Sequence, residues 1–151
     1  MMVETHSPEE TVALGRRLGA LLGAGDVVGL VGDLGAGKTQ FTKGIALGLG
    51  VPDARIVTSP TFVLMNAYDG RVPLRHYDLY RVEAVDLESL SFFDLRASGA
   101  TVIEWAEKAG DALGDRLEVR FEVTGETTRR ITFKATGVRP EAIMKSLVIS
   151  H

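Results

Sequence analysis

The chain has 151 residues, enough for one globular domain, and 45% of them are hydrophobic while 25% are charged. A net charge of −3 provides no broad basic surface of the kind that binds nucleic acid or anionic membranes. The absence of cysteine excludes disulfides, thiolate metal sites and cysteine nucleophiles. The first ten residues do not resemble a signal peptide and no apolar run is long enough to span a membrane, so we expect a cytoplasmic protein without a membrane partner.

The first predicted element is a helix that begins at Ser7. Ser7 can cap the helix, Pro8 suits the first helical position, and Glu10 completes a capping box. A stripe of leucines then faces the core, at Leu14, Leu18, Leu21 and Leu22. The glycines at 23 and 25 end the helix, whose expected role is packing.

The residues from Gly32 to Thr39 read Gly-Asp-Leu-Gly-Ala-Gly-Lys-Thr, which matches the phosphate-binding pattern G-x-x-x-x-G-K-T. The apolar run 27–31 before them is typical of a buried parallel strand. After them, Phe41, Ile45 and Leu49 form the apolar stripe of a helix that Gly50 closes. A glycine-rich turn without function is the alternative, and it leaves the match at all eight positions and both flanks unexplained.

This spacing suits phosphate chemistry. Glycines let the backbone N–H groups approach phosphate oxygens, and the following helix directs its free N–H groups at the same point. Lys38 would reach the β- and γ-phosphates, and the Thr39 hydroxyl would bind Mg²⁺. The residues predicted to bind nucleotide are Asp33, Leu34, Gly35, Ala36, Gly37, Lys38, Thr39 and Gln40.

The middle of the chain predicts a loop and then a hairpin. Residues 55–62 hold three hydroxyl side chains around Pro60, which is typical either of an ordinary loop or of a segment that senses the γ-phosphate. Residues 62–68 and 72–77 flank Asp69-Gly70 and should pair antiparallel. Pro73 should push its strand towards an edge of the sheet or a bulge.

Two carboxylates compete for the Mg²⁺ site. Asp78 follows the second strand of this hairpin, and Glu104 ends the apolar segment 101–105, which comes after a partly helical stretch closed by Gly99. A strand reached through a helical crossover should lie parallel to strand 27–31, so Glu104 would emerge beside the phosphate site. We expect His76 to be a structural histidine bonded to its neighbours, and Trp105 to have a packing role or a place at the site.

The last third of the chain predicts a second hairpin and a terminal helix. Residues 117–123 and 130–134 alternate between apolar and polar side chains, as antiparallel strands with one buried face do, and residues 140–148 suit a short helix. The elements together predict an α/β fold in which helices flank a mixed parallel and antiparallel sheet.

Four motifs occur in a specific order along the first 107 residues. They are the segment 32–39, Ser59-Pro60-Thr61-Phe62, His76-Tyr77-Asp78-Leu79-Tyr80-Arg81 and Ile103-Glu104-Trp105-Ala106-Glu107. This series resembles the TsaE family (older name YjeE), bacterial ATPases that assist the synthesis of threonylcarbamoyladenosine on tRNA. Gln40 departs from the family pattern, in which a second threonine commonly follows Thr39.

The resemblance implies a P-loop NTPase fold and a single P-loop ATPase domain over residues 1–151. It implies MgATP bound at residues 35–39, with Thr39 and Glu104 as metal ligands and Asp78 nearby, and it makes residues 59–62 the switch segment. Lys38, Asp78 and Glu104 would be the catalytic residues. The implied partners are the TsaD and TsaB proteins, with tRNA reached indirectly through their complex.

Other functions remain compatible with the residues alone. A small-molecule or nucleoside kinase could use the same loop, although the chain shows no arginine-rich lid. A nucleotide-sensing module without catalysis is a further alternative, whereas a GTPase lacks the expected Asn-Lys-x-Asp segment. An arginine that neutralises charge on the phosphates could be Arg55, Arg81 or a partner's residue.

Overall fold

The computed structural model describes residues 1–33, 35–53, 55, 57, 65–79 and 92–149. Its strands are β1 (Met2–Thr5), β2 (Val27–Val31), β3 (Met65–Tyr68), β4 (Leu74–Asp78), β5 (Ala100–Glu104), β6 (Arg116–Val123) and β7 (Arg129–Thr136). Its helices are α1 (Pro8–Leu21), α2 (Lys38–Gly48), α3 (Phe92–Leu95) and α4 (Val138–Ile149), with short 3₁₀ turns η3 (Arg96–Ser98), η4 (Ala106–Lys108) and η5 (Gly110–Leu113).

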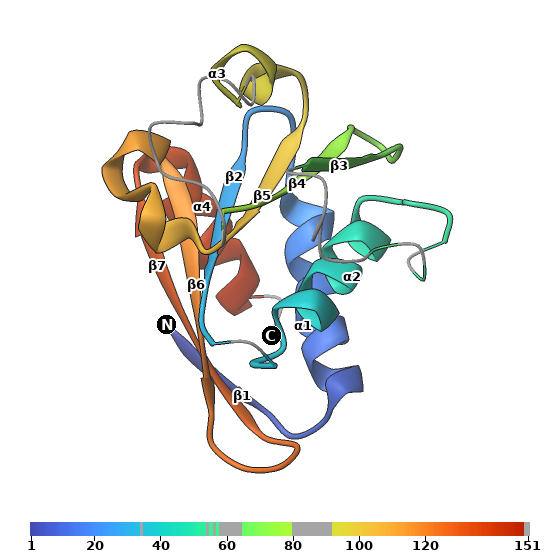
Figure 1. The fold of residues 1–151 in the computed structure, drawn as a ribbon, viewed down its shortest axis with the longest axis vertical. Helices are drawn as coiled ribbons and strands as arrows, with labels where there is room; N and C mark the ends of the chain where they lie inside the picture. The colour runs from blue at the N-terminus through green and yellow to red at the C-terminus, as the bar shows by residue number, and fades with distance from the viewer. Residues whose placement is uncertain (34, 54, 56, 58–64, 80–91, 150–151) are drawn as a thin grey trace.

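All the strands belong to one sheet in the order β1-β7-β6-β2-β5-β4-β3 (Figure 1). The strand β2 lies near its middle and is parallel to both neighbours, β5 and β6, while β4 is parallel to β5. The pairs β3–β4, β6–β7 and β1–β7 are antiparallel. The predicted mixed sheet, and the predicted parallel pairing of the strand before the phosphate loop with the strand that ends in Glu104, are therefore confirmed.

The two faces of the sheet are buried by different helices. Side chains of α1, α2 and α4 cover one face, whereas α3 and the 3₁₀ turns η4 and η5 contribute to a second cluster on the other. The strand β2 serves both clusters, because Val28 and Leu30 face the first and Val27 and Val31 face the second. A continuous apolar strand is what a parallel strand covered on both faces requires.

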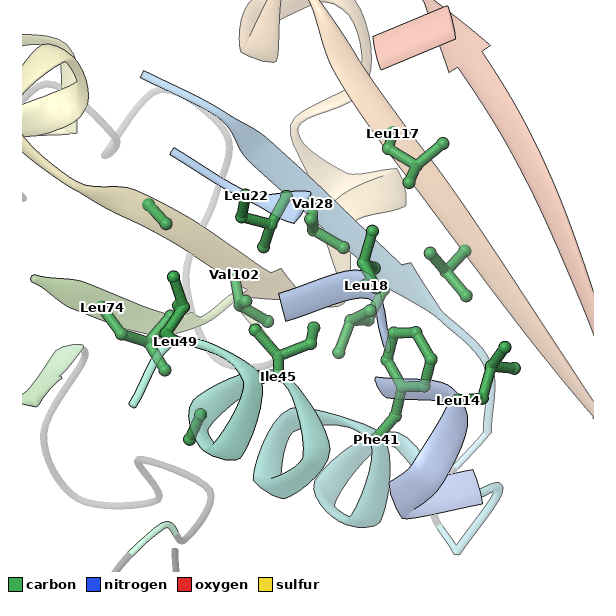
Figure 2. Close-up of a cluster of buried hydrophobic side chains, with 14 of the residues drawn as sticks. Leu14, Leu18, Leu22, Val28, Phe41, Ile45, Leu49, Leu74, Val102 and Leu117 are labelled. Carbon is green, nitrogen blue, oxygen red and sulfur yellow. The ribbon is translucent and has the colours of Figure 1, made fainter. Parts of the chain in front are cut away.

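The helix α1 begins at the predicted Ser7 cap, but Glu10 does not complete the predicted capping box at Ser7 itself. The Ser7 hydroxyl accepts a hydrogen bond from the Glu10 amide at 3.1 Å. The Glu10 carboxylate reaches back to the amide of His6 at 3.2 Å, one residue earlier than in a standard capping box. The leucines at 14, 18 and 22 are buried, and they lie with Phe41 and Ile45 of α2 over the sheet (Figure 2).

Helices α1 and α2 cross at unusually close range because glycines line both sides of the contact. Gly15 and Gly19 of α1 face Gly44 and Gly48 of α2. A Cβ added at Gly44 would lie 2.9 Å from the Gly15 Cα, and a Cβ added at Gly19 would lie 2.9 Å from the Ile45 Cα, so neither position leaves room for a side chain. The backbone of the helix that follows the phosphate loop thus rests directly on the backbone of α1.

The structure corrects one further expectation and adds one strand that was not expected, and two predicted segments fall outside the described residues. Pro73 does not push β4 to an edge, because it precedes the strand, and β4 lies between β5 and β3. The edge strand β1 was not expected, since its four residues include one buried side chain and show no clear periodicity. The segment 59–62 and most of the predicted helical stretch 82–98 lie outside the described part of the chain.

None of the described helices has the length and apolarity to cross a membrane.

Candidate functional site

The Gly32–Thr39 loop joins the carboxyl end of β2 to the start of α2 (Figure 1). Gly35 and Gly37 have φ of +78° and +106°, a region that side-chain-bearing residues rarely adopt. Gly37 is the N-cap of α2, and no side chain caps that end of the helix. A helix start without a capping side chain is typical of an anion-binding helix N-terminus, as the motif predicts. Leu34 lies outside the described residues.

Lys38 is buried inside the loop, with 4% of its surface exposed. Its ammonium donates a hydrogen bond to the Gly32 carbonyl at 2.6 Å and lies 4.1 Å from the centroid of the Trp105 ring. A carbonyl oxygen and the face of an indole both stabilise a cation. The structure thus brings the predicted lysine and the tryptophan after Glu104 together at the loop.

Trp105 is the one non-glycine residue with a positive φ, at 59°, in the described part of the chain. A bulky residue in this region is strained, and such strain clusters at functional sites. Trp105 follows the last residue of β5 and also packs on the second hydrophobic cluster. Packing and a place at the site are therefore not alternatives for this residue, because its ring does both.

The two predicted carboxylates lie at the ends of adjacent parallel strands, where Asp78 of β4 is in register with Glu104 of β5. Glu104 also pairs in register with Leu30, two residues before the loop begins. Its buried side chain accepts a 2.7 Å hydrogen bond from Nε2 of His76, which is fully buried. His76 is thus a bonded histidine as expected, although its partner is on the next strand and not beside it in sequence.

The remaining predicted nucleotide ligands line the start of α2. Asp33 is exposed, and its carbonyl accepts a hydrogen bond from the Ala36 amide at 3.1 Å. Thr39 and Gln40 are half-buried in the first turn of α2. Gln40 and Gly37 border a small pocket of about 80 Å³ whose other lining residues are Ser7, Pro8, Thr11, Glu126, Thr127 and Arg129.

Comparison with known proteins connects this arrangement to one family. The family model described as "Threonylcarbamoyl adenosine biosynthesis protein TsaE" matches residues 5–131. The chain belongs to the TsaE family. It is similar to the tRNA threonylcarbamoyladenosine biosynthesis protein TsaE of Bacillus subtilis, with 44% identity over 147 residues, which cover 95% of this chain and 90% of the relative. The corresponding protein of Treponema pallidum is 42% identical over 119 residues, covering 75% and 84% of the two chains.

A solved structure agrees with this result. The crystal structure of YdiB from B. subtilis matches with a TM-score of 0.83 and 38% identity, and the match covers 99% of this chain and 95% of that one. The predicted α/β P-loop fold with a mixed sheet is thereby confirmed for this TsaE chain.

Arg129 is a residue of the TsaE site that the sequence did not reveal. Its guanidinium donates to the Gly35 carbonyl in the loop at 3.3 Å, and also to the carbonyls of Gly125 and Thr128 at 3.1 and 2.8 Å. The hairpin β6–β7 is thus linked to the phosphate loop across 94 residues of sequence. Of the arginines proposed from sequence, Arg55 is an exposed partner of Asp53, and Arg81 lies outside the described residues.

Burial changes the pKa values of two groups near these strand ends. Partial desolvation raises the pKa of Glu107, an effect that the nearby Lys38 ammonium opposes. A carboxyl whose pKa is raised by folding favours the folded state at low pH, and that contribution disappears as the pH rises through the folded-state pKa. Burial likewise raises the pKa of Tyr77, against the smaller opposing effect of Arg75.

The residues at the strand ends fit a magnesium site of the phosphate-sharing type. Within the described ranges, no group of three or more His, Cys, Asp or Glu side chains could hold a metal by itself. Magnesium bound with a nucleotide typically uses one or two protein ligands, phosphate oxygens and water, so such a group is not required. A buried carboxylate at Glu104, kept in place by His76 beside the loop, is the kind of ligand that arrangement uses.

Proposed function

We propose that this chain binds and hydrolyses MgATP as an accessory subunit of the machinery that makes threonylcarbamoyladenosine on tRNA, together with the TsaD and TsaB proteins. One observation carries the proposal: a buried lysine at the head of α2 lies between the Gly32 carbonyl and Trp105, next to the strand end that bears Glu104. Family membership supports the pathway. Contact with tRNA would be indirect, through the complex.

In this proposal the chain's own residues bind and polarise the triphosphate. The loop amides and Lys38 bind the β- and γ-phosphates, and Lys38 exchanges its bond to the Gly32 carbonyl for phosphate oxygens. Thr39 and Glu104 are the proposed ligands of Mg²⁺, which supplies charge neutralisation on the γ-phosphate when bound. Asp78, which is in register with Glu104, would orient either the waters bound to the metal or the attacking water.

The experiment that tests the proposal is phosphate release from ATP, measured with and without TsaB and TsaD. We expect turnover that depends on the partners and that Lys38→Ala lowers by at least about a hundredfold, because the transition state loses a preorganised positive charge. Lys43→Ala is the matched control, since it removes a half-buried lysine from the same helix, away from the loop. Unchanged hydrolysis in Lys38→Ala would overturn the site assignment.

A labelled-ATP experiment separates hydrolysis from the kinase alternative. Incubation with [γ-³²P]ATP and candidate acceptors should release only inorganic phosphate. A labelled acceptor would instead make the protein a kinase, and the loop would then serve phosphoryl transfer to a substrate. A nucleotide-sensing role without catalysis would show ATP binding but no turnover, even with both partner proteins present.

A further inference from the structure

His76 and Glu104 form a polar contact at the base of the proposed metal site. The Nε2 and Oε2 atoms are 2.7 Å apart, and neither side chain has more than 4% of its surface exposed. This length lies in the range of hydrogen bonds that involve a charged partner. The two residues belong to neighbouring parallel strands, β4 and β5, so the bond spans 28 residues of sequence.

A purely structural reason for this pair is weak. Burying a charged pair costs desolvation free energy, and a pair of apolar side chains in the same space would often be as stable or more so. A polar pair in the core therefore suggests a functional role, and the location of the pair indicates what that role is. Glu104 is the last residue of β5, directly before the strained Trp105 whose ring contacts Lys38.

The bond constrains the Glu104 carboxylate. With one oxygen held by His76, rotation about the last side-chain bond is restricted, which limits the directions in which the second oxygen can point. The His76 ring has no other described hydrogen-bond partner, since its Nδ1 is buried and none of the described residues bonds to it. Glu104 is thus the one polar group in the described chain to which the ring is seen to hydrogen-bond. Ligating carboxylates commonly depend on such a supporting hydrogen bond.

We propose that His76 is a positioning residue that sets the affinity of this chain for the divalent cation bound with the nucleotide, by orienting Glu104. It does not touch the nucleotide or the reacting atoms. This inference rests on the proposed function, because it assumes that Glu104 binds the metal. The inference distinguishes two affinities. His76 should affect how much the metal strengthens nucleotide binding, and it should not affect the affinity for metal-free nucleotide.

The test compares two amide substitutions. Glutamine places an amide N–H near the position of Nε2 and can still donate to Glu104, whereas asparagine is too short and places its amide near Nδ1. Leu74→Val is the matched control, because it trims a buried side chain two residues earlier on β4 and leaves the pair intact. Each variant is first checked for wild-type circular dichroism and cooperative thermal unfolding.

Calorimetry gives the readout as a ratio, the dissociation constant for ATP in EDTA divided by that in Mg²⁺. We expect His76→Asn to lower this ratio about 10- to 100-fold, the usual effect of losing a supporting partner. His76→Gln and Leu74→Val should stay within about threefold of wild type, and ATP binding in EDTA should change little in all three.

A wild-type ratio in a folded His76→Asn protein would overturn the inference. An equal loss in Leu74→Val would also overturn it, because general loosening of β4 would then explain the effect. If His76→Asn does not fold, His76→Gln carries the test, and a loss of tenfold or more in that folded variant contradicts the role. Failure of the wild-type protein to bind ATP, or a wild-type ratio of one, would instead refute the proposed MgATP site.

Discussion

Replacing Gly19 with alanine tests the close crossing of α1 and α2. The added Cβ would lie 2.9 Å from both the Cα and the carbonyl carbon of Ile45. These are backbone atoms in the middle of α2, so no side chain can rotate away to make room. The helices must move apart, and the buried layer beneath them, which includes Leu18 and Phe41, must loosen with them.

The expected magnitude is the difference between two opposing effects. Overpacking a well-packed interface costs about 1–3 kcal/mol, and a clash with backbone atoms, the Ile45 carbonyl oxygen nearest among them, belongs to the upper part of that range, about 2–3 kcal/mol. Alanine recovers about 1 kcal/mol, because it is a better helix former than glycine. We expect a net loss of about 1–2 kcal/mol in the free energy of unfolding, which for a chain of this length lowers the melting temperature by about 2–8 °C.

Thermal and urea unfolding of Gly19→Ala measure this loss, and Ala13→Gly on the exposed side of α1 calibrates the propensity term in the same helix. A melting temperature that rises in Gly19→Ala would refute the reasoning, because propensity would then outweigh packing. When Gly15→Ala is added to Gly19→Ala, it should lower the free energy of unfolding by less than Gly15→Ala does in the wild-type protein, because the helices have already separated.

Three further predictions concern the site. Trp105 is the sole tryptophan, and its ring contacts the Lys38 ammonium, so ATP binding should change the tryptophan fluorescence. Lys38→Met should remove that change. If calorimetry detects ATP binding while the emission stays the same, the lysine has not moved. The pKa of Glu107, measured by ¹³C NMR titration, should rise further in Lys38→Ala, because the opposing positive charge is gone; a fall would contradict the assigned cause. Arg129→Ala should weaken ATP binding about tenfold, because the loop loses a hydrogen bond from a charged donor. Arg130→Ala is the control, and its affinity for ATP should stay within about twofold of wild type, because the ion pairs it loses are long and lie at the surface. Equal losses of affinity in the two variants, measured by calorimetry, would argue against a specific role for Arg129.

Local patterns in the sequence predicted the elements that hold the loop. The apolar run of β2, the glycines and Lys38, and the four-residue spacing of Phe41, Ile45 and Leu49 all act over a few residues, and the structure confirms the strand, the turn and the helix. The cap at Ser7 and the hairpin β6–β7 belong to the same class. Each of these features depends on neighbours in sequence, which a pattern can display.

The features that the sequence did not reveal depend on distant partners. Arg129 reaches the carbonyl of Gly35, and His76 reaches Glu104, only after strands from different parts of the chain have been placed side by side. The internal position of β4 was hidden by Pro73, whose constraint acts before the strand begins. The switch role of residues 59–62 and the ligand roles of Thr39 and Glu104 stay predictions.

The position of β2 in the sheet bears on how the protein is made. Val28 pairs with Val102 on one side and with Leu117 on the other, so both neighbours of this strand are synthesised long after it. A growing chain that has just passed residue 50 already contains every residue of the phosphate loop, but nothing yet pairs with the strand that supports it. Assembly of the loop must wait for two long-range parallel pairings, which close slowly because their chain entropy is lost before any contact is gained. The nascent protein therefore acquires its nucleotide site only after both β5 and β6 have been synthesised.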